Sequence, residues 1–126
     1  MNWPEGSYVV FGSGPMAVAG IRESSDIDLL VSDELAKQLK ADGWQEIEKT
    51  PNDKPLVQGD FEAHKSWEFS SYKPTLEHLL STATVIDGVP FASLQEVRKW
   101  KTASARPKDL TDIKLIDNYL AKKKKF

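Results

Sequence analysis

The sequence predicts an α+β (mixed α/β) fold, in which a short mixed β-sheet is flanked by helices and the C-terminus is helical. Two observations carry this prediction. Short apolar runs rich in β-branched and aromatic residues alternate with helical segments in the N-terminal half, and helical periodicity dominates the C-terminal part. Strands followed by helices are typical of this class. A chain of 126 residues supports one hydrophobic core, so we expect a single domain over residues 1–126.

The first predicted elements surround a glycine-rich turn. Residues 7–11 are an apolar, β-rich run that ends at a glycine, which predicts a strand. Pro15 suits the first turn of a helix, so a short helix is predicted over residues 16–21. The sequence becomes apolar again at Ile27, and the second strand is predicted over residues 25–31.

The middle of the chain predicts one helix and two more strands. Ser32 can cap a helix whose first turn is acidic and which ends at the next glycine. Residues 44–49 alternate and predict a strand, and residues 51–55 have the composition of a turn. Residues 56–69 predict one further strand with an irregularity at Gly59.

The C-terminal part predicts three helices and one short β segment. Residues 75–82 have leucines at helical spacing, and residues 84–91 form a β segment with an Asp-Gly turn. Residues 93–104 predict a helix that opens with the Ser-x-x-Glu spacing of a capping box. The stretch "ARPK" at 105–108 interrupts it, and residues 109–120 predict a last amphipathic helix.

The composition excludes several classes of protein. Net charge is −2, with 40% hydrophobic and 29% charged residues, so the chain lacks the general basic field of a nucleic-acid-binding protein. The absence of cysteine excludes disulfides and thiolate metal sites. The two histidines, His64 and His78, do not make a convincing zinc site, so a bound metal would be magnesium, manganese or calcium on carboxylate oxygens.

The ends of the sequence predict neither secretion nor a membrane. The N-terminal residues have neither the basic region nor the apolar region of a signal peptide. No apolar stretch reaches the roughly 18 residues that a membrane-spanning helix needs. We therefore expect a cytoplasmic protein without a membrane partner, and we interpret Lys122–Lys125 as the solvated end of the last helix.

Two aspartates interrupt the second predicted strand. Because side chains alternate along a strand, Asp26 and Asp28 point to one face and Ile27 to the other. Their Cα atoms would lie about 6.6 Å apart, which lets two carboxylates share a divalent cation or span a metal pair. Two like charges on one face need either a counter-cation or exposure to solvent at a sheet edge, and the aspartates alone leave both alternatives open.

A glycine-rich turn precedes these aspartates. Gly12, Ser13 and Gly14 lie between a strand and a helix, where free backbone N–H groups bind phosphate oxygens and glycine permits close approach. The alternative is a tight turn in which Ser13 only caps the helix. A phosphate site and a carboxylate pair separated by one short helix together match the needs of a nucleoside triphosphate. The Gly-x-x-x-x-Gly-Lys-Ser/Thr pattern of a P-loop is missing.

The stretch "GSGPMAVAGIRESSDIDLLV" resembles the signature of the nucleotidyltransferase superfamily, whose best-known member is DNA polymerase beta. That signature is Gly followed by Gly or Ser, about a dozen residues, and Asp-x-Asp within an apolar strand; here twelve residues separate Ser13 from Asp26. The later stretch "WKTASARPKDLTDIKLI" is similar to a Lys…Arg-x-Lys-Asp-x-x-Asp helix pair of small bacterial nucleotidyltransferases. These include abortive-infection toxin and antitoxin proteins and antibiotic-modifying enzymes.

This resemblance implies a nucleotidyltransferase-like domain and an enzyme that transfers a nucleoside monophosphate from a nucleoside triphosphate to an acceptor. It implies that Gly12 and Ser13 bind the phosphates and that Asp26 and Asp28 hold Mg²⁺ or Mn²⁺. Four cations are expected near the phosphates, although each is also compatible with an ordinary surface or helix-end charge: Arg22, Lys101, Arg106 and Lys108.

The resemblance also implies a third carboxylate on a neighbouring strand, as a general base or a metal ligand. Alternation over residues 56–69 places five polar residues on one face: Asp60, Glu62, His64, Ser66 and Glu68. The three acids among them are the candidates. The superfamily sets its third acid between apolar residues, and "Phe-Glu-Ala" is the match, so Glu62 is the predicted catalytic residue and metal ligand. Asp60 and Glu68 are the second and third candidates.

The acceptor and the partners stay open at this stage. A small molecule such as an antibiotic, a protein side chain and the 3′ end of a tRNA all fit the resemblance, and so do ATP and the other nucleoside triphosphates. A homodimer, or a toxin or antitoxin partner, would complete a site in so short a chain. Two competing hypotheses remain: a non-catalytic partner subunit with this fold, and an unrelated phosphate-binding α/β domain.

Overall fold

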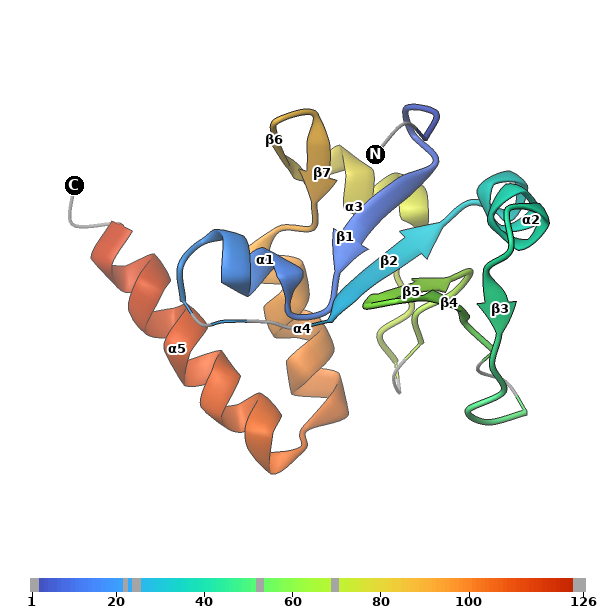
Figure 1. The fold of residues 1–126 in the computed structure, drawn as a ribbon. Coiled ribbons are helices and arrows are strands. Elements are labelled where there is room, and N and C mark those ends of the chain that lie inside the picture. The colour runs from blue at the N-terminus through green and yellow to red at the C-terminus, as the bar shows by residue number, and fades with distance from the viewer. Residues whose placement is uncertain (1–2, 22, 24–25, 52–53, 69–70, 124–126) are drawn as a thin grey trace.

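The computed structural model describes residues 3–21, 23, 26–51, 54–68 and 71–123. The strands are β1 (Tyr8–Phe11), β2 (Ile27–Val31), β3 (Gln45–Glu46), β4 (Leu56–Gln58), β5 (Phe61–His64), β6 (Thr84–Ile86) and β7 (Val89–Phe91). The helices are α1 (Gly14–Val18), α2 (Asp33–Ala41), α3 (Leu76–Ser81), α4 (Leu94–Ser104) and α5 (Pro107–Lys123). The strands of this described part form one mixed sheet in the order β3-β4-β5-β2-β1-β7-β6 (Figure 1).

The middle of the sheet sets the geometry of the candidate site. β2 pairs with β1 in the antiparallel sense and with β5 in the parallel sense. This register places Phe11 beside Asp28 on one side and Glu62 beside Asp28 on the other. The glycine turn after β1, the start of β2 and the β5 strand that carries the predicted third carboxylate therefore meet at one end of β2, although they are distant in the sequence.

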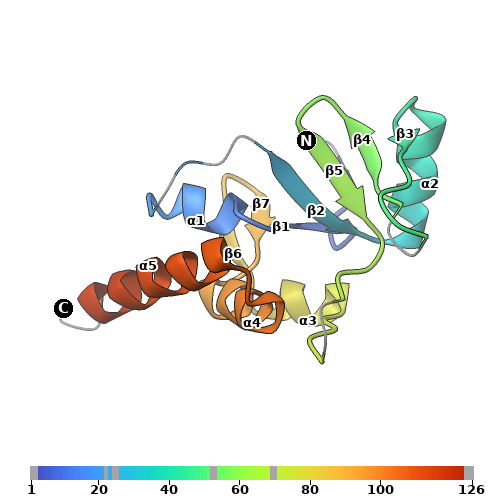
Figure 2. The same ribbon diagram turned by 90° about the horizontal axis from the view of Figure 1, so that it is seen from below.

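Alternating side chains divide the core between the two faces of the sheet. One cluster, packed with α1, α3, α4 and α5, contains Val9, Phe11, Met16, Leu30, Trp67, Leu79, Ala92, Val97, Trp100 and Ile116. The other, packed with α2, contains Tyr8, Val10, Leu29, Val31, Leu35, Ala36, Leu39, Leu56 and Ala63. Figure 2 shows α3, α4 and α5 together on one side of the sheet and α2 beside β3. Burial of each large apolar side chain contributes about 1.5–3 kcal/mol.

Hydroxyl side chains cap three of the helices: Ser32 and Ser93, which were predicted as caps, and Thr75, which was predicted only as the first residue of a helix. The side chains of Ser32, Thr75 and Ser93 each accept a hydrogen bond from the backbone N–H three residues later. The helix starts predicted from these residues are therefore confirmed. The Asp87-Gly88 turn is confirmed as well, since both residues have positive φ, at 51° and 78°, and join β6 to β7 as a tight hairpin.

The prediction of one strand over residues 56–69 is wrong. The structure has two antiparallel strands, β4 and β5, joined by a turn at Gly59 and Asp60. Gly59 has a φ of 58°, and this left-handed conformation reverses the chain at the position where an irregularity within one strand was predicted. Phe69, the last residue of the predicted strand, lies outside the described residues, as do Ser25 and the centre of the turn predicted over 51–55.

Other boundaries differ by a few residues. α1 begins at Gly14, before its predicted start, because Pro15 occupies the first turn. α5 begins at Pro107 and continues to Lys123, beyond the predicted end.

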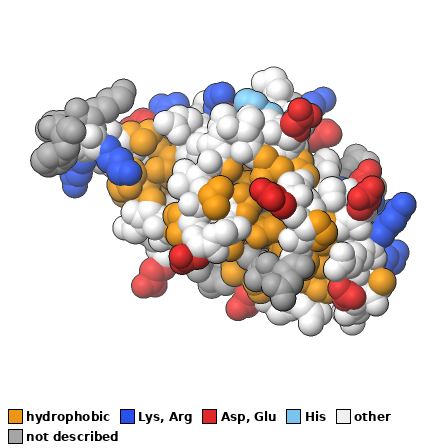
Figure 3. Space-filling view, turned by 90° about the horizontal axis from the view of Figure 1, so that it is seen from above, with side chains coloured by type: hydrophobic (Ala, Val, Ile, Leu, Met, Phe, Trp, Pro, Cys, Tyr) orange, Lys and Arg blue, Asp and Glu red, His pale blue; other side chains and the backbone are white. Residues whose placement is uncertain are grey.

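None of the described helices is long and apolar enough to cross a membrane. Seen from above, hydrophobic side chains gather in the middle of the surface, with Lys and Arg side chains towards its rim (Figure 3).

Candidate metal and nucleotide site

Three polar side chains meet where β2 and β5 lie side by side. One ligand atom from each of Asp28, Glu62 and His64 lies within 4.8 Å of the other two. The parallel register causes this, because Asp28 pairs with Glu62 and Leu30 pairs with His64, so all three polar groups share one face of the sheet. The three side chains are 23%, 19% and 10% exposed, which leaves them accessible at the end of the hydrophobic core.

The backbone of Gly12 lies directly against the Asp28 carboxylate. Gly12 has a φ of 63°, and a Cβ atom on it would overlap Oδ2 of Asp28. Both the left-handed backbone and this close approach require glycine. Ser13 follows, immediately before α1, and its hydroxyl makes no capping hydrogen bond with that helix. The interpretation of Ser13 as a simple cap is therefore not supported.

We expect Gly12→Ala to lower both the stability of the protein and its affinity for Mn²⁺. The added methyl group strains the backbone and also displaces the Asp28 carboxylate. Gly59→Ala is the matched control, since Gly59 has a φ of 58° and nothing within 4 Å of an added Cβ. The control should lose only the roughly 1–2 kcal/mol of a left-handed alanine. Thermal unfolding and a Mn²⁺ titration measure both effects. Equal destabilisation of the two variants with unchanged Mn²⁺ affinity would contradict this contact.

His64 closes the other side of Asp28. Its Nε2 lies 3.7 Å from Oδ1 of Asp28, and its ring meets Trp67 edge to face at 4.9 Å. Alternation along the predicted strand placed His64 on the same face as Glu62, but His64 was not predicted to belong to the site. That shared face was the signal for a role of His64 beside Glu62, because residues two apart on a strand point to the same side.

Glu62 has a cationic neighbour that the sequence analysis missed. Lys49, from the segment between β3 and β4, places Nζ 2.5 Å from Oε1 of Glu62. Asp60 and Glu68, the other candidates for the third carboxylate, are exposed and do not belong to the cluster with Asp28. Asp60 lies in the β4–β5 turn, where its carbonyl oxygen accepts a hydrogen bond from the N–H of Ile27.

Three other predicted site residues lie outside the cluster of Asp28, Glu62 and His64 or outside the described residues. Asp26 is exposed immediately before β2 and is outside the three-residue cluster. Arg22 lies outside the described residues. Lys108 is exposed in the first turn of α5. The roles predicted for these residues stay predictions.

Lys101 occupies a buried ion-pair network in place of an open phosphate site. Its Nζ lies 2.9 Å from Oδ2 of Asp112 and 3.5 Å from Oδ1 of Asp109, and its side chain is 2% exposed. Such a side chain offers no surface to a bound phosphate in this conformation, so the structure does not support the predicted contact. Asp109 and Asp112 orient this cation across the α4–α5 junction.

Arg106 belongs to the same junction. Its Nε and Nη2 donate to the two carboxylate oxygens of Asp109, whose Oδ2 also accepts from the backbone N–H of Arg106. Burial of Asp109 acts to raise the pKa of its carboxyl group, but hydrogen bonds from Arg106 and Ser104 outweigh it and lower the pKa to about 2. The side chain of Arg106 as a whole is 45% exposed, so it remains accessible to solvent.

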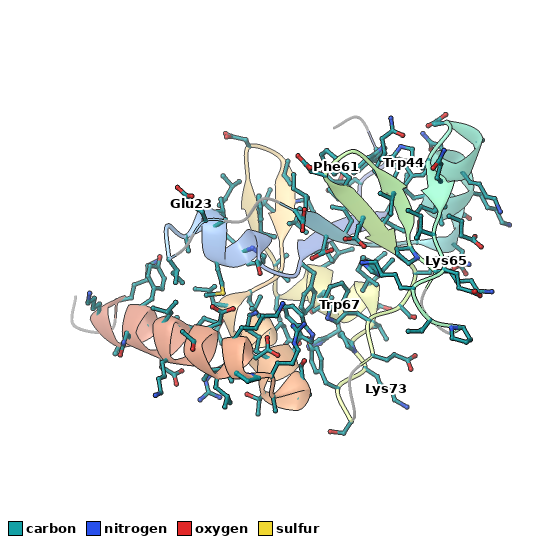
Figure 4. All side chains as sticks on the ribbon, turned by 60° about the horizontal axis from the view of Figure 1, so that its bottom comes forward. Glu23, Trp44, Phe61, Lys65, Trp67 and Lys73 are labelled. Atoms are coloured by element: carbon teal, nitrogen blue, oxygen red, sulfur yellow. The ribbon has the colours of Figure 1, made fainter. Side chains whose placement is uncertain are left out.

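An aromatic layer joins this junction to the floor of the candidate site. Trp67 stacks on Phe11 at 5.1 Å and meets Trp100 edge to face at 5.1 Å. Lys101 Nζ lies 4.5 Å from the ring of Trp100. Trp67 lies between the sheet and the C-terminal helices (Figure 4). Trp67 and Trp100 are both buried core residues.

Together, the mixed sheet with carboxylates on neighbouring strands and the helical C-terminus form a nucleotidyltransferase-like α+β fold. The structure of this chain is similar to the crystal structure of the aminoglycoside nucleotidyltransferase ANT(2")-Ia in complex with adenylyl-2"-tobramycin. The TM-score is 0.58 at 17% sequence identity, over 94% of this chain and 82% of that one. No protein-family model matches the chain, and no curated protein sequence matches it significantly. The likeness therefore establishes the fold.

Proposed function

We propose that this protein is a metal-dependent nucleotidyltransferase. The observation that carries the proposal is the cluster of Asp28, Glu62 and His64 beside the Gly12 turn, in a nucleotidyltransferase-like fold. In the proposed reaction an acceptor oxygen bonds to the α-phosphorus of a nucleoside triphosphate. The α–β phosphoanhydride bond breaks and pyrophosphate leaves.

The donor set fits a divalent cation. Asp28 and Glu62 supply two carboxylates on one face of the sheet, where like charges need a counter-cation, and His64 adds an imidazole nitrogen. Oxygen donors suit Mg²⁺, and the imidazole makes Mn²⁺ an equally good fit. We propose that Asp28 and Glu62 hold the ion with Asp26, which alternation along the strand places on the same face as Asp28. A bound divalent ion neutralises the charge of the triphosphate and polarises its oxygens.

The nucleotide phosphates are assigned to the turn after β1. The backbone of Gly12 lies against the carboxylate of Asp28, one of the proposed metal ligands, and a glycine turn lets a phosphate approach the backbone N–H groups closely. Arg106 and Lys108 are the exposed cations that we propose for the triphosphate end. We propose that Lys101 has an indirect role. Its ion pairs with Asp109 and Asp112 stabilise the α4–α5 junction, which carries Arg106 and Lys108.

Glu62 is proposed as the general base. The acceptor hydroxyl transfers its proton to the Glu62 carboxylate as the acceptor oxygen attacks, and Lys49 orients that carboxylate from 2.5 Å away. Positioning and charge neutralisation supply the rest of the rate enhancement, as in other phosphoryl and nucleotidyl transfers.

We expect Glu62→Gln to lower the turnover number by about 10²- to 10⁴-fold, because an amide cannot take the acceptor proton. Nucleotide affinity should change by less than about threefold, since the turn at Gly12 and the carboxylate of Asp28 remain. Glu68→Gln is the matched control, because Glu68 is exposed beyond β5 and outside the cluster. Steady-state kinetics and nucleotide titrations separate the two effects. Normal turnover in Glu62→Gln would remove Glu62 from the reaction.

One observation favours the alternative, a non-catalytic partner subunit of toxin–antitoxin type. The ammonium group of Lys49 already compensates the charge of Glu62, as a residue that replaces a metal ion would. A purified protein that binds no divalent cation and transfers no label from any nucleoside triphosphate, but whose Lys49→Met variant binds Mn²⁺, would support this alternative. Cation binding by the wild-type protein favours the enzyme.

A further inference from the structure

A polar cavity of about 370 Å³ adjoins the candidate metal site. Its polar lining consists of Glu46, Lys54, His64, Lys65 and Ser66. His64 belongs both to this lining and to the cluster with Asp28 and Glu62, so the cavity opens beside the reacting centre. The volume lies within the range of small-molecule sites.

The cavity and the glycine turn lie on opposite sides of Asp28. Oδ2 of Asp28 is against the backbone of Gly12, and Oδ1 faces Nε2 of His64. In-line displacement at phosphorus brings the acceptor in opposite the leaving pyrophosphate. If the triphosphate binds at the Gly12 turn, as proposed above, the acceptor therefore approaches from the His64 side, where this cavity is found.

The charges around the cavity do not cancel. Lys54 lies 3.5 Å from Glu48, and Glu46 lies 3.8 Å from Lys40, so each of these lining charges is compensated. Lys65 is exposed and lies immediately after β5 (Figure 4). It forms no ion pair with any residue that the structure describes.

The excess charge at the cavity is therefore positive. Lys49 lies nearby, but its ammonium group pairs with Glu62 and adds nothing to this excess, which comes from Lys65. An acceptor that carries amino groups would meet like charge here, and an acceptor that carries a carboxylate or phosphate would meet opposite charge.

We propose that this cavity binds the acceptor and that Lys65 selects a small, polyhydroxylated acceptor that carries one negative charge, such as a sugar acid. The inference rests on the proposed function for the location of the acceptor, and on the cavity charges for its class. It distinguishes this protein from ANT(2")-Ia, whose crystal structure holds an adenylylated aminoglycoside. The acceptor hydroxyl would approach Glu62 past His64 while the anionic group stays at Lys65.

Three six-carbon polyols that differ only at the first carbon test this selection: gluconate is anionic, sorbitol is neutral and glucamine is cationic. Binding of each to the wild-type protein is measured by NMR titration without nucleotide, with the signals of His64 and Ser66 locating the site. Label transfer from a triphosphate to each polyol is measured separately, so a failure of nucleotidyl transfer leaves the binding order readable. Lys65→Glu reverses the critical charge, and Lys114→Glu on the exposed side of α5 is the control.

We expect the wild type and the control to bind gluconate about tenfold more tightly than sorbitol, and glucamine most weakly. Lys65→Glu should reverse the order of gluconate and glucamine. Three results would overturn the proposal: tighter binding of glucamine by the wild type, an unchanged order in Lys65→Glu, or gluconate binding that leaves His64 and Ser66 unaffected. A protein that binds none of the three polyols overturns it as well.

Discussion

Asp28→Asn is expected to lower nucleotidyl transfer by about 1,000-fold or more while the protein remains folded. Asp28 occupies the centre of the site, because one carboxylate oxygen lies against Gly12 and the other faces His64, and its strand neighbour is Glu62. An asparagine of the same size keeps the packing but removes one of two neighbouring negative charges. The melting temperature should therefore stay unchanged or rise, while the affinity for Mg²⁺ or Mn²⁺ falls.

Asp60→Asn is the matched control for this substitution. Asp60 is an exposed aspartate in the adjacent β4–β5 turn, outside the three-residue cluster, so its variant should retain activity and metal affinity. Transfer rate, metal affinity and melting temperature are measured for both variants. Full activity in an Asp26→Asn, Asp28→Asn double variant would contradict the metal site, and unfolding of Asp28→Asn would identify a structural role instead.

Lys101→Met is expected to destabilise the protein by about 3–5 kcal/mol. The substitution keeps the length of the side chain but leaves the buried carboxylates of Asp109 and Asp112 without their shared ammonium group. Lys108→Met, in the exposed first turn of α5, is the control and should change stability by less than about 0.5 kcal/mol. Urea unfolding gives both values. A loss below about 1 kcal/mol in Lys101→Met would show that the junction does not depend on this pair.

The same junction predicts a dependence of stability on pH. The pKa of Asp109 is about 2 in the folded protein, below the ordinary value of 3.8. Protons therefore bind more tightly to the unfolded chain, so this carboxylate stabilises the fold fully above about pH 4 and loses that contribution as the pH falls towards 2. Asp109→Asn removes this titration, and its free energy of unfolding should fall less steeply over that interval than the wild-type value.

The sequence predicted the fold class because its signals are local. Ser32, Thr75 and Ser93 begin helices through hydrogen bonds to residues three positions away, and the Asp87-Gly88 turn depends on the residues within it. The hairpin at Gly59 was missed, because glycine in a β-rich run is compatible with both a bulge and a reversal of the chain. Only the pairing of β4 with β5 distinguishes them.

The candidate site was predictable only in part. Alternation left three candidate acids, and the resemblance to the superfamily, whose third acid lies between apolar residues, selected Glu62. The sheet places Glu62 beside Asp28. Lys49 was not predictable, because it reaches Glu62 through the tertiary packing of the segment between β3 and β4. The resemblance predicted that Lys101 binds a nucleotide phosphate. Its side chain is instead buried against Asp109 and Asp112, which depends on how α4 and α5 pack. Long-range contacts of this kind leave no periodic signal in a sequence.

The most direct test of metal-dependent nucleotidyl transfer compares two labels in the same triphosphate. The purified protein is incubated with Mg²⁺ or Mn²⁺, a cell extract as the source of acceptors, and ATP or another nucleoside triphosphate labelled at either the α- or the γ-phosphate. The account predicts that the α-label is transferred to an acceptor and the γ-label is released as pyrophosphate, and that chelation of the metal or the Asp28→Asn substitution abolishes both. Transfer of the γ-label, or α-label transfer that persists in Asp28→Asn, would contradict it.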